Sequence, residues 1–171
     1  MRNDMLKFIE AINSSKFLNT EEEYSIFWDS LENLKEASKE EISNPIEYVE
    51  KLFKILNNET EDFETLMEVV FFIFEFARNK NIDIDEFIKT IFIEFDEMKE
   101  DKIIWVEEII SLMIKKEYID AIKFHLNNSD KKIIEAFKFI SSGFINDLSL
   151  DKPTISYAKE IFSFIENLNS N

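Results

Sequence analysis

Hydrophobic side chains recur every three or four positions along most of this sequence, which is the spacing of one face of an α-helix. Residues 24–34 show the pattern clearly, with apolar side chains at Tyr24, Phe27, Trp28, Leu31 and Leu34. Thr20 and Glu23 stand just before this stretch. A threonine followed three positions later by a glutamate forms a capping box, which satisfies backbone N–H groups at a helix start. We therefore predict a helix that begins directly after Thr20.

Other polar start signals predict most of the remaining helices. The signals are Asn44 and Pro45 with Glu47, Asn58 or Thr60, Asp83 with Glu86, Asp101, and Asp151 before Pro153. Helices are also predicted over 4–12, from Asp101 to about Lys116, and over 118–126 and 130–142. We expect Gly143 to end the helix over 130–142, because glycine readily takes the left-handed conformation that closes a helix.

Residues 69–76 form an apolar stretch that could be a helix or a strand. A buried strand has this composition, but no stretch of useful length in the chain alternates strictly between polar and apolar side chains. The residues on both sides of 69–76 keep helical spacing. We therefore predict a helix that is buried on two sides.

These elements predict an all-α protein of eight or nine helices. The connections between helices are short, so successive helices should pack as antiparallel hairpins. Candidate first helices of pairs begin near Asn44, Asp83 and Glu117, at intervals of 39 and 34 residues, which lie within the range of helical-pair repeats. The second helices are spaced less regularly, at 43 and 28 residues. We favour stacked hairpins of the HEAT or armadillo kind, and the alternative is an irregular helical bundle.

Composition agrees with a single helical domain over 1–171. Hydrophobic residues make up 45% of the chain, whereas glycine occurs once and proline twice, and sheet-rich folds need more turn residues than that. The absence of cysteine excludes disulfides and thiolate chemistry. The most apolar run, 69–74, is far shorter than the roughly 20 residues that span a bilayer, and the first residues lack a signal-peptide pattern. We expect a soluble, cytoplasmic protein.

Charge is large and unevenly distributed. The net charge is −16, and residues 1–110 hold 28 acidic and 12 basic side chains, whereas residues 111–171 hold 8 of each. A negative field repels nucleic acid and anionic membranes and attracts basic partners. The charge could also serve solubility alone. We expect no nucleic-acid or membrane partner, and we consider a protein partner with a basic surface.

No catalytic motif is present. His125 is the only histidine, whereas zinc proteases and di-iron bundles need several histidines and carboxylates at helical spacing. We predict that His125 lies near the end of a helix and faces the helix dipole. Gly143 is the only glycine, which excludes a glycine-rich phosphate loop. We expect no enzyme activity, no metal, no cofactor and no small-molecule ligand.

The overall make-up of the chain, which is small, acidic and without catalytic residues, resembles that of bacterial immunity proteins of polymorphic-toxin and contact-dependent growth inhibition systems. The resemblance covers general character over the whole chain and includes no diagnostic motif. It implies a non-enzymatic protein that captures a cognate toxin domain, often a nuclease with a positive groove. Acidic side chains would cover that groove and steer fast association.

The acidic stretch IEFDEMKEDKIIWVEE, residues 93–108, is the predicted contact surface for such a partner. Trp105 falls with Ile109 and Leu112 at the edge of an apolar arc, where it could be a partly exposed anchor or pack at the edge of the core. Several of the acids also have a structural reason to exist, because carboxylates favour helix starts. The predicted site residues are Glu94, Asp96, Glu97, Glu100, Asp101, Trp105, Glu107 and Glu108, with Glu61, Asp62 and Glu64 as an extension.

Two other functions are compatible with the sequence. A helical-repeat scaffold or adaptor would hold a peptide or helix in an apolar groove, and salt would hardly change its rate of association. A DNA mimic would space carboxylates like phosphates and block a nucleic-acid-binding protein, although lysines interrupt the acidic charge here.

Overall fold

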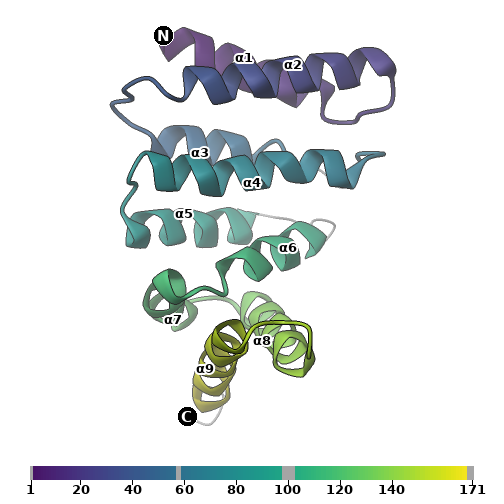
Figure 1. Ribbon diagram of the computed structural model, residues 1–171. Helices are drawn as coiled ribbons and strands as arrows, with labels where there is room; N and C mark the ends of the chain where they lie inside the picture. Colours follow the sequence, from purple (N-terminus) through teal and green to yellow (C-terminus); the bar gives the residue numbers. More distant parts are fainter. Residues whose placement is uncertain (1, 57–58, 98–102, 169–171) are drawn as a thin grey trace. The chain divides into compact units, whose positions relative to one another are not determined.

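The computed structural model describes residues 2–56, 59–97 and 103–168, and every regular element in these ranges is helical (Figure 1). The predicted all-α class is therefore confirmed. The helices are α1 (Arg2–Ser15), α2 (Glu21–Ala37), α3 (Ile46–Phe53), α4 (Phe63–Asn79), α5 (Ile84–Glu97), α6 (Ile103–Met113), the short 3-10 helix η2 (Lys116–Tyr118), α7 (Ile119–Leu126), α8 (Lys131–Asn146) and α9 (Lys152–Leu168).

The chain divides into two compact units, Met1–Asp83 and Ile84–Asn171. Unit 1 contains α1 to α4, and unit 2 contains α5 to α9. The single domain over 1–171 and the HEAT-like stacking of hairpins remain predictions.

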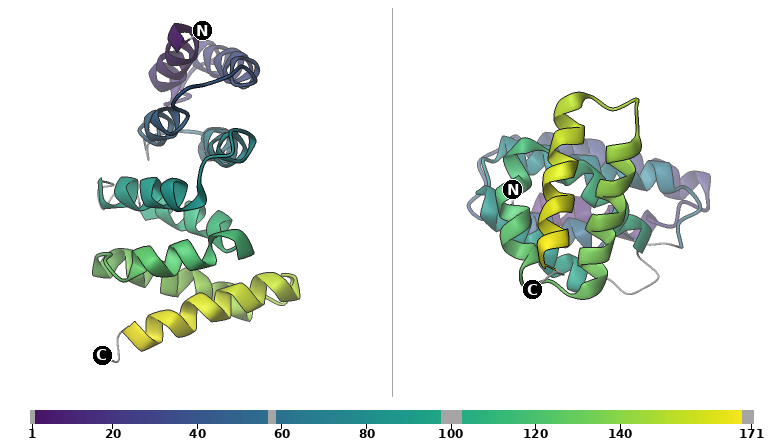
Figure 2. Two further views of the ribbon diagram at one scale, coloured as in Figure 1. Left: turned by 90° about the vertical axis from the view of Figure 1, so that its left-hand side faces the viewer. Right: turned by 90° about the horizontal axis from the view of Figure 1, so that it is seen from below.

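Unit 1 consists of two helical hairpins, α1 with α2 and α3 with α4. Its helices form two layers, with α1 and α3 in one and α2 and α4 in the other (Figure 2, left). The buried side chains of these helices are mostly apolar, and their burial removes apolar surface from water. The most deeply buried side chains include Ile12, Phe27, Leu31, Leu34, Val49, Leu52, Leu66, Val70 and Ile73.

The predicted start of α2 is confirmed, with one change in its capping box. The Thr20 hydroxyl accepts a hydrogen bond from the Glu23 backbone N–H at 3.1 Å. The Glu23 carboxylate accepts from the Asn19 N–H at 2.6 Å, whereas in a standard box it would accept from the N–H of the capping residue. The Glu23 side chain thus bonds to Asn19, the residue before the capping residue Thr20.

Two predicted helix starts are wrong in detail. α4 begins at Phe63 and is capped by Asp62, whose carboxylate accepts from the Thr65 N–H at 2.9 Å; Thr60 does not cap it, because its hydroxyl instead accepts from the Asp62 N–H at 3.2 Å. Asn58 lies outside the described residues. α3 begins at Ile46 after Pro45, without a side-chain cap from Asn44.

The ambiguous stretch 69–76 is helical and lies within α4. Five of its side chains are buried, namely Val69, Val70, Phe72, Ile73 and Phe76. At about 100° per residue these five positions lie on one broad, contiguous face of the helix. The predicted helix is therefore confirmed, but it is buried on one broad face and not on two sides. The other three residues are not buried: Phe71 is 47% exposed, Glu75 is exposed and Phe74 is partly exposed.

Unit 2 is built around the α8–α9 hairpin, whose two helices lie side by side (Figure 2, right). α6 packs against α8, and α5 and α9 both contact α7. The rings of Phe92 and Phe137 stack at 5.5 Å between α5 and α8. Asp130 and Asp151 cap α8 and α9 by accepting from backbone N–H groups three residues on. These two helix starts were predicted correctly.

The predicted helix end at Gly143 is wrong. α8 continues to Asn146, and Gly143 has no positive φ angle. Glycine costs only about 1 kcal/mol relative to alanine inside a helix, and packing of α8 along α9 outweighs that cost. A left-handed residue does follow α4: Asn81 has φ of 50°, and the Ile82 N–H reaches back to the Ala77 carbonyl at 3.0 Å.

Candidate functional site

The acidic side chains of the predicted contact surface, residues 93–108, differ in how exposed they are. Glu94 on α5 is only 6% exposed, whereas on α6 Glu107 is partly exposed and Glu108 is exposed. Asp96 and Glu97 end α5, but their side chains lie outside the description, as do Glu100 and Asp101 altogether. Among the described side chains of this stretch, only Glu107 and Glu108 are thus accessible carboxylates.

Trp105 is fully buried, with 0% of its surface exposed. Of the two interpretations of Trp105, packing in the core is therefore the one that the structure supports, and the partly exposed anchor is wrong. The reason is that α6 is apolar on several sides: Val106, Ile109 and Ile110 are also buried. A residue at the edge of the apolar arc of α6 can therefore still lie in the core. Trp105 cannot contact a partner unless unit 2 loses its packing.

The predicted extension lies at the start of α4 in unit 1. Glu61 and Glu64 are exposed, whereas Asp62 is engaged within the protein. Its carboxylate accepts hydrogen bonds from the Thr65 N–H, from the Thr65 hydroxyl at 2.6 Å and from the Tyr24 hydroxyl at 3.0 Å. The bonds from Thr65 are the main reason why the pKa of Asp62 is below its ordinary value. Asp62 therefore caps α4 and ties it to α2.

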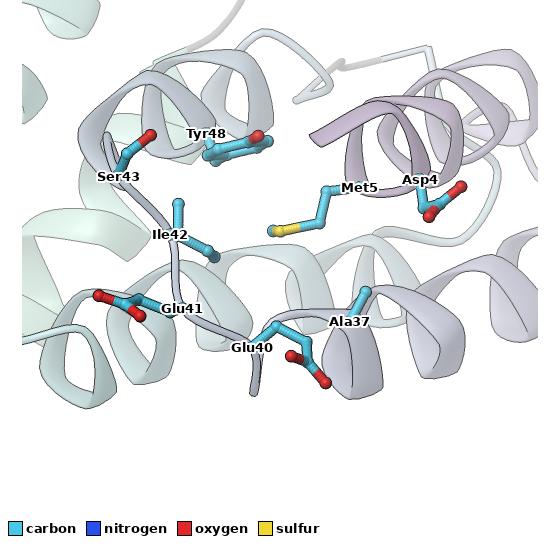
Figure 3. A pocket seen from close by; sticks show the side chains of 8 residues that line it. All are labelled: Asp4, Met5, Ala37, Glu40, Glu41, Ile42, Ser43 and Tyr48. Atoms are coloured by element: carbon cyan, nitrogen blue, oxygen red, sulfur yellow. The ribbon is translucent and has the colours of Figure 1, made fainter. Parts of the chain in front are cut away.

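Unit 1 also holds a pocket of about 310 Å³, which no pattern in the sequence indicates (Figure 3). Three helices and one connection contribute to it: the first turn of α1, the end of α2, the α2–α3 connection and the start of α3. The lining residues are Asp4, Met5, Ala37, Glu40, Glu41, Ile42, Ser43 and Tyr48.

The inside of this pocket is apolar. Met5 and Tyr48 are nearly buried, and the thioether of Met5 points towards Ile42 across the pocket, beside the Tyr48 ring (Figure 3). The rings of Tyr48 and Phe76 pack in an edge-to-face arrangement, at 6.5 Å between ring centres. Rings in this edge-to-face arrangement attract each other, so the wall formed by Tyr48 is well supported.

The outside of the pocket is acidic. Asp4, Glu40 and Glu41 are exposed at its rim. The Lys80 ammonium group lies beside the rim, where it donates to the Glu40 backbone carbonyl at 2.5 Å. Within the described part of the chain, no ion pair involves the carboxylates of Glu40 or Glu41. The pocket therefore combines an apolar wall with a negative entrance.

A second pocket of about 280 Å³ lies between α1 and α3. Its apolar residues are Leu6, Ile9 and Ile55. Glu10 and Asn13 stand opposite Lys51 and Lys54 in its lining. Because this lining carries both acidic and basic side chains, it favours neither a cationic nor an anionic ligand.

His125 lies in the last turn of α7, near the helix end as predicted. Its ring packs on Phe92 at 5.4 Å and against the edge of Phe124 at 5.2 Å. Burial is the main cause that lowers the pKa of His125 below its ordinary value. The neutral imidazole is thus favoured. Among the described residues, no group of three or more histidines and carboxylates could hold a metal ion.

Comparisons with known proteins leave the function open. No protein-family model matches this chain, and neither the curated proteins nor the solved structures contain a match. Within the described ranges, no helix combines the length and apolar character needed to cross a bilayer.

Proposed function

We propose that this chain is a non-enzymatic binding protein that captures a basic protein surface, in the manner of an immunity protein that neutralises its cognate bacterial toxin. The excess of carboxylates carries the proposal. Residues 1–83 contain 19 acidic and 9 basic side chains, so at least 10 carboxylates would lack a basic partner there even if every basic side chain paired with one. Residues 84–171 contain 17 acidic and 11 basic side chains.

The acidic side chains of unit 1 are accessible to a partner. Exposed carboxylates occur on all four of its helices, including Glu10 on α1, Glu32 on α2, Glu50 on α3 and Glu75 on α4. Such a field attracts a positively charged protein and raises the rate of productive encounter. A toxin nuclease would fit as the partner, because the groove that holds nucleic-acid phosphates must be positive.

The proposal predicts salt-dependent association with a basic partner. The protein would be immobilised, the partner captured from cells of the source organism, and association measured with the purified partner. Between roughly 0.1 M and 1 M salt the Debye length falls from about 10 Å to about 3 Å, so the association rate should fall steeply. A neutral or acidic partner, or a rate that does not respond to salt, would contradict charge-led capture.

The immunity role requires a separate test. The captured partner would be expressed in a test bacterium, with and without this protein. The partner alone should stop growth, and co-expression should restore it. A partner that binds with strong salt dependence but never harms the cell would refute the immunity role and leave capture of a basic protein standing.

A scaffold or adaptor that binds a peptide or helix is the second candidate, favoured by the apolar inside of the α1–α2–α3 pocket. Peptide grooves of this kind obtain affinity from apolar burial. Their association rate should change little with salt, which is the opposite of the expectation above.

A further inference from the structure

The pocket formed by α1, α2, the α2–α3 connection and α3 has a chemistry that selects one kind of occupant. Its inside presents the apolar surfaces of Met5, Ile42 and Tyr48, and its rim presents Asp4, Glu40 and Glu41. An anionic group would be repelled at this rim. A purely aliphatic group would fill the inside but would make no favourable interaction with the carboxylates at the rim.

A long cationic side chain satisfies both parts of the pocket. Lysine and arginine carry an aliphatic stem that packs on apolar surface while the charged group stays at the polar edge. The volume of about 310 Å³ is at the lower end of the range of ligand pockets, about 300–1,000 Å³, which suits one side chain better than a large cofactor. The nearby Lys80 donates to the Glu40 backbone carbonyl and is not among the lining residues, so the three rim carboxylates outnumber this one cation and the rim stays negative.

We propose that this pocket anchors a lysine or arginine side chain of the basic protein partner. The stem lies against Met5, Ile42 and Tyr48, and the cationic group lies among the carboxylates of Asp4, Glu40 and Glu41. This inference rests on the proposed capture of a basic protein and assigns it a specific anchor. Such an anchor differs from attraction by a general negative field, because it requires an apolar pocket and a group of carboxylates at the same place.

The first test uses short blocked peptides as probes of the full chain. Three peptides of the form glycine–X–glycine carry lysine, norleucine or acetyl-lysine at X, and binding is followed by NMR of ¹³C-labelled methionine methyl groups. The Met5 signal is identified by its loss in Met5→Leu. The lysine peptide should shift this signal in a saturable manner, at a concentration about tenfold lower than either uncharged peptide, given the usual strength of a few exposed charge pairs.

The second test compares two triple variants with the same change in charge. The rim variant carries Asp4→Asn, Glu40→Gln and Glu41→Gln. The control carries Asp29→Asn, Glu32→Gln and Glu75→Gln, which are exposed helix residues of unit 1 outside the pocket. The rim variant should weaken binding of the lysine peptide about tenfold, whereas the control should change it less than about twofold. Circular dichroism confirms that both variants keep their helices.

Each contrary outcome has a definite meaning. If the uncharged peptides shift Met5 as readily as the lysine peptide, the pocket takes apolar groups and the proposal fails. If both triple variants weaken binding equally, the general field acts and no anchor exists. The proposal also fails if the lysine peptide leaves Met5 unchanged at every concentration. Salt-dependent capture of a basic partner could still hold in these cases, so the failure of the anchor is separable from failure of the proposed function.

Discussion

At the scale of single residues, two buried serines differ in how their hydroxyl groups are satisfied. Ser15 on α1 donates to the Ala11 carbonyl at 3.0 Å and lies near the Ile12 carbonyl at 3.2 Å. Ser141 on α8 is equally buried, but its hydroxyl has no hydrogen-bond partner within the described part of the chain. A buried polar group without a partner loses its bonds to water and gains none in return.

We expect Ser141→Ala to leave the free energy of unfolding unchanged or to raise it by about 1 kcal/mol, because it removes that uncompensated group. The matched variant Ser15→Ala should lower the free energy of unfolding by about 1 kcal/mol, because the substitution removes a hydroxyl that makes a hydrogen bond. Urea unfolding followed by circular dichroism measures both. An equal loss in both variants would show that Ser141 is in fact hydrogen-bonded in solution.

Asp62 should make stability depend on pH. Its pKa is lowered in the folded state, chiefly by the hydrogen bonds from Thr65, so folding favours the ionised carboxylate. That stabilisation is complete above the pKa of aspartate in the unfolded chain, about 3.9, and is lost as the pH falls through the lower pKa of the folded state.

The variant Asp62→Ala should therefore be less stable than the native chain by about 1 kcal/mol near neutral pH, which is the usual cost of losing a helix cap. The difference should shrink as the pH is lowered below about 4. Urea unfolding at a series of pH values measures this difference in stability. The exposed control Asp29→Ala should differ from the native chain by an amount that hardly depends on pH. A difference that stays constant down to the lowest pH would contradict this role of the carboxylate.

At the scale of elements, α8 contains a glycine that its conformation does not require. Gly143 has no positive φ angle, and an added Cβ atom would meet no atom within 4 Å apart from its chain neighbours and the nearby backbone of α8. Left-handed backbone occurs elsewhere, at Leu18 with φ of 56° and at Asn81 with φ of 50° after the end of α4. Glycine adopts that conformation without steric cost, whereas other residues pay for it.

We expect Gly143→Ala to raise the free energy of unfolding by about 0.5–1 kcal/mol, because alanine loses less backbone entropy on folding into a helix. The complementary change Asn81→Gly should not destabilise, because it places glycine where φ is positive. Thermal unfolding followed by circular dichroism measures both variants. Destabilisation by Gly143→Ala would mean that α8 is not continuous through this residue in solution.

At the scale of the whole molecule, a net charge of −16 on 171 residues is a source of self-repulsion. Surface ion pairs such as Lys35–Glu68 at 3.7 Å and Lys138–Glu166 at 2.5 Å join neighbouring helices. Exposed pairs of this kind contribute at most about 1 kcal/mol each. Repulsion among the remaining carboxylates should therefore dominate the electrostatic part of the stability.

The melting temperature should consequently rise with sodium chloride, because salt screens repulsion between like charges. The triple variant Asp29→Asn, Glu32→Gln and Glu75→Gln should melt higher than the native chain at low salt, and this difference should shrink at high salt. Scanning calorimetry at several salt concentrations measures both effects. A melting temperature that falls with added salt would show that attractive ion pairs outweigh the repulsion.

Local features of the fold could be predicted from the sequence because they depend on residues close together in the chain. The caps at Thr20, Asp130 and Asp151 each bond a backbone group three residues away, and the periodicity of apolar side chains decides between helix and strand within one element. The carboxylate excess is likewise a property of composition alone.

The location of a candidate site depended on contacts between distant residues, which only the tertiary structure decided. Trp105 is buried because α6 is covered on more than one side, and a helical wheel shows only one helix at a time. The pocket joins Met5, Ile42 and Tyr48 through the packing of three helices. The sequence by itself determined the helical class, several helix starts and the sign of the charge, since these follow from local bonds and residue counts. Packing decided which acids and aromatic side chains are accessible, since burial depends on what lies against each helix.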